Sequence, residues 1–261
     1  MGPTGIPTGS PTAQLQAFAQ SVYKLIKNRY YSDLTTVDGQ NFLSMVVDWV
    51  NEYIDELEYE ITSDGDPIDW IWVRSVMVNL GMATINTSSI TFDTGTYRKP
   101  VSGQDRYIQV LNSSGQALSN FAVVSIDDIS NDTRKNTDDM VANVNGTLYF
   151  SRPFRNYEDG GTIVGDMTGY LPRVQTNLNS QGAIIATNTS VFSTVKPFTL
   201  LKLGTTKNAI LPDIVMGGLN PSYTQKYNDL LTNAINHSMA SAVSPTADYE
   251  NYEGQVHGVG F

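Results

Sequence analysis

The spacing of apolar residues changes twice along this 261-residue chain, and this change limits the fold more than any single motif does. Through the first third, and again after residue 220, apolar residues recur every three or four positions, which is the period of an amphipathic helix. From about residue 85 the pattern becomes short runs of β-branched and aromatic residues separated by Gly and Asn. The sequence therefore predicts an α+β fold with a helical base, made of three N-terminal helices plus a C-terminal helix, a β-rich antiparallel insertion domain and extended termini.

Helix boundaries are marked by capping residues. Ser10-Pro11 and Asn220-Pro221 each place an N-cap residue before a proline at the first helical position. Asp38 and Asp66 are expected to begin two further helices, the second of which would end at Gly81. The expected helices are 11–29, 38–61, 66–81 and 221–244, and the clearest expected strands are 107–111, 121–126, 147–150 and 198–203.

These elements suggest a domain division. We expect a flexible N-terminal arm over residues 1–10, a helical domain over 11–84, a β-rich domain over 85–212, a C-terminal helix over 213–244 that packs on the helical domain, and an extended tail over 245–261. The densest apolar stretch, residues 70–78, is broken by Arg74 and is too short to cross a bilayer. No membrane partner is expected.

The composition excludes several function classes. A formal net charge of −10 argues against general affinity for nucleic acid, because contacts to phosphates require a basic surface. The absence of Cys excludes disulfides, thiolate metal sites and a Cys nucleophile. Neither His237 nor His257 lies in a recognisable catalytic motif, and no nucleotide-binding, hydrolase or zinc-protease signature occurs. We expect no enzyme activity, no metal and no cofactor.

Two groups of carboxylates are weaker candidates for chemistry. Glycosidases use a pair of carboxyl groups, and four aspartates of the β-rich region would be available for one. They are Asp127, Asp128, Asp138 and Asp139. Adjacent aspartates on a strand point to opposite faces, so simple solvation of turns is the favoured interpretation. Residues 63–69 resemble a fragment of a calcium loop but lack its twelve-residue ligand pattern, and turn and helix-capping roles explain them.

The region from Asp48 to Asp69 contains nine acidic residues and no Lys or Arg. Helical spacing places Asp48, Glu52 and Asp55 opposite the apolar stripe, with Glu56 beside them, which predicts an unpaired negative face. A solvated helix face is one interpretation. If copies were arranged in a ring, these acids would line a channel through which another polyanion slides without sticking.

Three segments mark the helical frame of the chain. They are Tyr30-Tyr31-Ser-Asp-Leu, Asp48-Trp49-Val-Asn-Glu, and Asp213-Ile-Val-Met-Gly-Gly-Leu-Asn-Pro-Ser-Tyr, which precedes the last helix. The helical frame that contains them resembles the head-to-tail adaptor (connector) proteins of tailed bacteriophages. The likeness is one of arrangement, and the β-rich region is larger than a minimal adaptor requires.

The resemblance implies a structural virion protein in the neck region, assembled in the host cytoplasm. It implies a ring of about twelve copies beneath the portal protein, which extends the DNA channel and contacts the next tail or nozzle protein, while DNA passes without specific binding. In that family the C-terminal segment reaches into the portal. The matching stretch here is 245–261, with Tyr249, Tyr252 and Phe261 as anchors, because aromatic residues dominate interface energies. An ordinary unstructured terminus is the alternative interpretation.

Basic residues of the β-rich region are possible contacts to acids of a neighbouring subunit, at about 0 to 1 kcal/mol for each exposed pair. They are Arg98, Lys99, Arg106, Arg152 and Arg155.

Two other functions remain open. A β-rich carbohydrate- or receptor-binding tail or fibre component is compatible with 14 Tyr and 3 Trp, although Trp49 and Trp72 fall on expected apolar helix faces. A carboxylate-based hydrolase is the third possibility.

Overall fold

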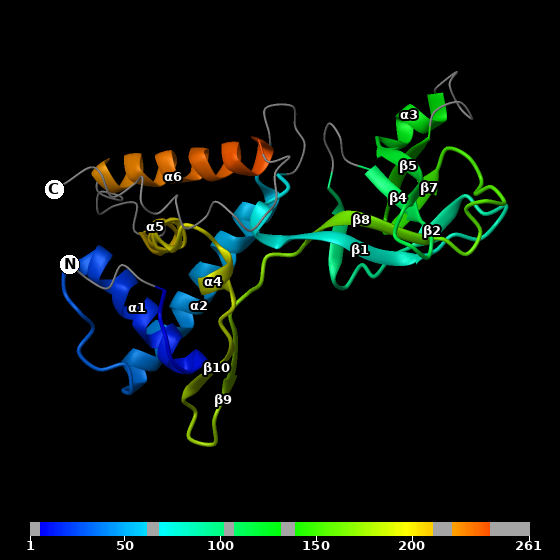
Figure 1. The fold of residues 1–261 in the computed structure, drawn as a ribbon. Helices are drawn as coiled ribbons and strands as arrows, with labels where there is room; N and C mark the ends of the chain where they lie inside the picture. Colours follow the sequence, from blue (N-terminus) through cyan, green and yellow to red (C-terminus); the bar gives the residue numbers. More distant parts are fainter. Residues whose placement is uncertain (1–5, 62–67, 102–106, 132–138, 211–220, 241–261) are drawn as a thin grey trace. The chain divides into compact units, whose positions relative to one another are not determined.

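The computed structural model describes residues 6–61, 68–101, 107–131, 139–210 and 221–240. Its contacts divide into two compact units (Figure 1). The helical unit comprises residues 1–68 and 171–261, so it is built from both ends of the chain, and the β unit comprises residues 69–170. The fold is α+β, as expected, but the β unit begins and ends earlier than the expected β-rich domain at 85–212.

Two helices open the helical unit close to where capping residues place them. α1 (Pro11–Lys27) begins after Ser10, whose side chain accepts a hydrogen bond from a first-turn N–H, and ends at Asn28 in the left-handed conformation. α2 (Val37–Tyr59) is capped by Thr36 rather than by the expected Asp38. Each helix ends two residues before its expected boundary.

The later part of the helical unit contains a hairpin and three helices. They are β9 (Gln175–Leu178), β10 (Ile184–Asn188), α4 (Val191–Thr194), α5 (Phe198–Ile210) and α6 (Pro221–Ala240). α5 packs on α1, α2 and α6, and the Tyr53 and Tyr227 rings of α2 and α6 meet edge to face, with centroids 6.1 Å apart. The last helix therefore lies against the same helical frame as the first two.

The expected strand over 198–203 is wrong, because these residues begin α5. This helix is buried on nearly every side, including at Leu200, Leu201 and Leu203. A helix surrounded by protein has no polar face, so its sequence carries no helical period, and a short apolar run cannot be told from a buried strand.

The β unit is a curled, mixed eight-stranded sheet that forms a half-barrel (Figure 1). Its strands run in the order β1-β8-β4-β5-β6-β7-β2, and β3 also pairs with β8. Their bounds are β1 (Arg74–Met82), β2 (Ser89–Thr91), β3 (Tyr97–Pro100), β4 (Tyr107–Leu111), β5 (Ala117–Val123), β6 (Met140–Val144), β7 (Thr147–Phe150) and β8 (Thr162–Gly169), with the short helix α3 (Ile126–Asn131) between β5 and β6. The expectation of a purely antiparallel region is wrong, since β5 and β6 run parallel.

The expected third helix over 66–81 is also wrong in the described part of that range. Residues Ile71–Val73 form a single 3₁₀ turn, and β1 follows and pairs with β8. β1 carries two register shifts, at 75–78 and 79–81, and each adds a residue to the strand. These bulges break the alternation of a regular strand, so that apolar residues recur at spacings that imitate a helix.

Candidate functional site

The outward face of α2 carries the acidic residues that the sequence singles out. Asp48 and Glu52 lie one turn apart and are exposed. They lie opposite the buried stripe of the same helix, which includes Val46, Val50 and Ile54. No ion pair to Asp48 or Glu52 forms within the described residues. These two carboxylates form what we call the α2 acidic face.

The expected unpaired face also included Asp55 and Glu56, and for these two residues the expectation is wrong. The Arg173 guanidinium binds Asp55 and lies 2.9 Å from a carboxylate oxygen of Glu58. These contacts, that with Asp55 first, raise the pKa of Arg173. The Lys207 ammonium lies 2.9 Å from a carboxylate oxygen of Glu56. Two basic residues from the later half of the chain thus neutralise part of the acidic run.

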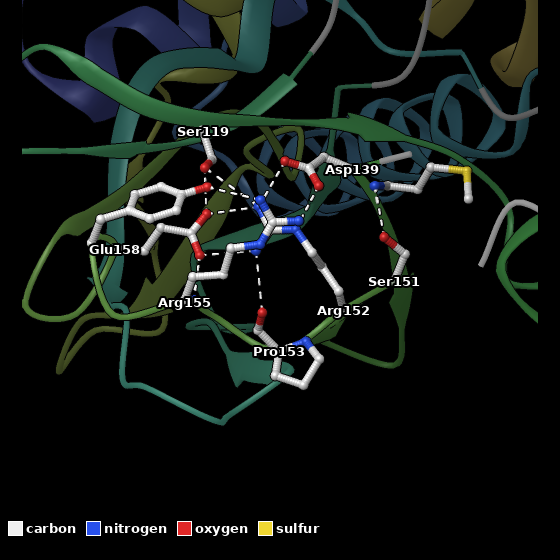
Figure 2. A network of polar contacts seen from close by, with 9 residues as sticks. Ser119, Asp139, Ser151, Arg152, Pro153, Arg155 and Glu158 are labelled. Carbon is white, nitrogen blue, oxygen red and sulfur yellow. Dashed lines mark hydrogen bonds and ion pairs between the residues drawn. The ribbon is translucent and has the colours of Figure 1, made fainter. Parts of the chain in front are cut away.

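A second cluster of charges lies inside the β unit, around Arg152 (Figure 2). The Arg152 guanidinium donates to both carboxylate oxygens of Asp139, at 2.6 and 2.7 Å, and to both oxygens of Glu158, at 2.9 and 2.8 Å. The Ser119 hydroxyl donates to Glu158, and the guanidinium lies over the Phe121 ring at 4.9 Å from its centroid. We call this set the Arg152 network.

Water is nearly excluded from two members of the Arg152 network, Arg152 and Glu158, whereas Asp139 is 28% exposed. The side chain of Arg152 is 5% exposed and that of Glu158 is fully buried. Burial raises the pKa of Glu158, but hydrogen bonds from Arg152, the Arg155 N–H and Ser119 lower it further, so the pKa lies below its usual value. Hydrogen bonds to Glu158 and Asp139 raise the pKa of Arg152. The network is therefore a charged, structural link between β5, the start of β6 and the 152–158 turn.

The Arg152 network does not have the arrangement of a glycosidase pair. Such a pair needs one carboxyl group to hold a proton for the leaving group and both groups to face a sugar. Here Asp139 and Glu158 are both held by one guanidinium, and the pKa of Glu158 is lowered rather than raised. This geometry stabilises a fold and presents no free acid.

The basic residues expected at subunit contacts have other surroundings where they are described. Arg152 is buried and binds Asp139, and Lys99 lies 3.0 Å from a carboxylate oxygen of Asp69 in the same unit. Arg155 is exposed and donates to the Tyr157 hydroxyl, and Arg98 is half-buried in β3. Arg106 lies outside the described residues.

The remaining candidates have structural roles or lie outside the described ranges. Asp127 and Asp128 are in the first turn of α3 and not on a strand, and Asp128 exchanges hydrogen bonds with Ser125 as a helix cap. His237 is in the last turn of α6. The predictions that fall outside the described residues concern Asp138, the 63–67 part of the calcium-like segment, His257, and the tail anchors Tyr249, Tyr252 and Phe261.

Trp70 and Trp72 bear on carbohydrate binding, because sugars stack on exposed rings. The two indoles stack on each other, with centroids 4.6 Å apart, and Trp70 is 2% exposed. Trp49 is half-buried on α2 and meets Phe42 edge to face. Trp70 is therefore buried, and Trp49 and Trp72, which are half-buried, each pack against an aromatic neighbour.

Sequence reasoning missed three residues that shape these clusters: Arg173, Lys207 and Glu158. Each acts on a partner that the local pattern does not reveal, since Arg173 and Asp55 are 118 positions apart. A short sequence signal exists only for Glu158, which lies six residues after Arg152.

Within the described ranges, no group of three or more His, Cys, Asp or Glu side chains could hold a metal ion. None of the helices described is both long enough and apolar enough to cross a membrane. No protein-family model matches the chain, and a search of curated proteins finds no match either.

Proposed function

We propose that this chain is a structural, non-enzymatic protein of a tailed-phage virion that forms a ring adaptor between the portal protein and the next tail or nozzle protein. The ring, of about twelve copies, extends the DNA channel, and no metal or cofactor takes part. The observation that carries the proposal is the α2 acidic face, where Asp48 and Glu52 are exposed and have no cation partner among the described residues.

DNA must move through the channel of such a ring. A channel for a polyanion has to repel phosphates, because bound phosphates would resist sliding. Two exposed carboxylates per copy, repeated around a ring, would supply such a surface even though Asp55 and Glu56 are held by basic partners. The joining of both chain ends in one helical unit also supports the proposal, since it leaves the β unit as an insertion that can contact a neighbour.

Electron microscopy of the complex purified from its source tests the ring. The expected result is class averages with rotational symmetry around an open channel, between a capsid vertex and a tail. A fibre, or a closed small oligomer with no channel, would contradict the proposal. A glycan-binding assay on the same preparation tests the alternative of a carbohydrate- or receptor-binding component.

Charge reversal tests the channel assignment separately. Glu52→Lys should leave ring assembly unchanged and reduce DNA ejection, because a cation in the channel binds phosphate. Asp127→Lys, an equal charge reversal at an exposed site in the β unit, is the control. Equal ejection by both variants would contradict the channel assignment.

Deletion of residues 245–261 should abolish docking to the portal, and unchanged docking would remove the proposed anchors Tyr249, Tyr252 and Phe261.

A further inference from the structure

The β9–β10 hairpin has one edge that is closed and one that is open. In an antiparallel pair, successive residues direct their N–H and C=O groups alternately toward and away from the partner strand. On β10 the outward N–H groups of Ile184 and Ala186 donate to the side chains of Gln40, at 2.6 Å, and Thr12, at 3.1 Å. The helices α1 and α2 thereby close this edge.

The outer edge of β9 is closed at only one position. Asn51 of α2 binds both the N–H and the C=O of Val174, at 3.0 and 3.1 Å. By the same alternation, Thr176 and Leu178 direct their backbone groups outward. No hydrogen bond from the described residues reaches these groups, and the Leu178 side chain is 70% exposed.

This edge lacks the features that usually protect one. Exposed edge strands normally carry charges, Pro or a bulge, which block pairing with another chain. β9 reads Gln-Thr-Asn-Leu, and the register shift of this hairpin is in β10. Indeed all 22 residues from 174 to 195 are uncharged, in a chain with a net charge of −10. Two copies can therefore approach one another at this segment without repulsion between charges on it.

We infer that the open edge of β9 pairs with β9 of a second copy of this chain, antiparallel and across a twofold axis. The register follows from the backbone groups that can still pair. The N–H and C=O of Val174 already bind Asn51, so the outward backbone groups of Thr176 and Leu178 are the ones left to pair. Thr176 of each copy faces Leu178 of the other and exchanges two backbone hydrogen bonds with it. Asn177 then lies directly opposite its own copy, at the axis.

Such a contact is closed by its symmetry and holds free chains as dimers. It does not depend on the ring proposed above, in which each copy would contact its neighbours through two different surfaces. The two ideas fail separately: rings are seen or not seen by microscopy, whereas the β9 pairing is read from cross-linking of the purified chain.

Cysteine cross-linking tests the register without background, because the chain has no Cys. Asn177 and Asn177 of the second copy form a non-hydrogen-bonded pair, in which the two Cα atoms are about 4.5 Å apart. A disulfide can span this distance. Asn177→Cys, oxidised with copper phenanthroline, should therefore give a covalent dimer. Gln175→Cys is the matched control, since it is exposed on the same face of β9 but its two copies would lie about 13 Å apart along the strands.

The expected result is a dimer band for Asn177→Cys, none for Gln175→Cys, and loss of the dimer when Leu178→Lys is added to Asn177→Cys. A monomer for Asn177→Cys would overturn the inference, and so would equal cross-linking of the two single variants. Sedimentation velocity of the unmodified chain gives a second readout. A dimer fraction that rises with concentration and disappears in Leu178→Lys supports the pairing, and a monomer throughout contradicts it.

Discussion

The β unit and the helical unit both use arginine to join distant segments, but in opposite environments. In the β unit, the side chain of Arg152 is 5% exposed and meets a fully buried Glu158. In the helical unit, the side chains of Arg173 and Asp55 are 43% and 50% exposed. Water solvates the second pair whether or not it forms, whereas a partner left alone in the first would remain a buried charge. Similar ion pairs are therefore expected to differ greatly in their effect on stability.

The two units also differ in what else stabilises them. The β unit has an apolar core inside the curled sheet, and the Arg152 network lies at its margin, over Phe121. The helical unit depends on close contact between helices, as where the Tyr53 ring lies against Gly204. The β unit thus contains a buried ion-pair network beside its apolar core, whereas the Arg173–Asp55 pair of the helical unit lies at the surface.

Removal of the buried guanidinium should have the largest effect. Arg152→Met leaves Glu158 buried without its partner and should destabilise the protein by about 3 to 5 kcal/mol, the cost of breaking a buried ion pair. Urea unfolding followed by circular dichroism measures this as a lower midpoint. Arg155→Met is the control, because this exposed side chain should contribute less than about 0.5 kcal/mol. Equal losses for both variants would refute the contrast.

Acid should weaken the β unit through the same carboxylate. Since the pKa of Glu158 is lowered in the folded state, the unfolded chain takes up its proton first as the pH falls. The stability from this group is present above its usual pKa of 4.5 and is lost below it. Urea midpoints between pH 7 and pH 3 should therefore fall more steeply for the native chain than for Glu158→Gln. Parallel pH profiles would show that Glu158 carries no such linkage.

Capping residues and apolar spacing predicted those helices whose boundaries depend on nearby residues alone. α1, α2 and the start of α6 were predicted to within two residues, because capping residues and a helical period act over a few positions. The helix expected over 66–81 and the strand expected over 198–203 were wrong for a different reason. Bulges disturbed the strand period of β1, and burial on nearly all sides removed the helical period of α5. Both are effects of tertiary structure.

Charged residues show the same difference between what local sequence predicts and what tertiary structure decides. Helical spacing correctly placed Asp48 and Glu52 on the side of α2 away from the core, because that depends only on the helix. The partners Arg173 and Lys207 follow from the return of the chain after the β unit, so no local pattern could reveal them. For the same reason Arg152 was expected on the surface, although Glu158 lies only six residues away.

Close packing in the helical unit should matter more than its ion pairs. A Cβ at Gly204 would lie 2.2 Å from the Tyr53 ring, so Gly204→Ala requires either this ring or the helices α2 and α5 to shift. The expected loss is about 1 to 3 kcal/mol, as for other overpacked cores, despite the better helix propensity of Ala. Thermal unfolding would measure it as a lower Tm. The control is Asn41→Ala, at an exposed helical site where no atom is added near the core. Gly182→Ala is unsuitable because Gly182 has a positive φ, so Ala would be strained there. A Tm for Gly204→Ala as high as that of the control would refute the packing argument.

The smallest effect is expected for the exposed ion pairs. Arg173→Gln should cost about 0 to 1 kcal/mol, because water and salt replace the guanidinium at Asp55. The difference between Arg173→Gln and the native chain should shrink further in 1 M salt, where the screening length is about 3 Å. The loss for Arg152→Met should persist there, because water and ions do not reach Glu158. Urea unfolding at low and high salt therefore separates the two environments, and a salt-independent loss for Arg173→Gln would show that this pair behaves as a buried one.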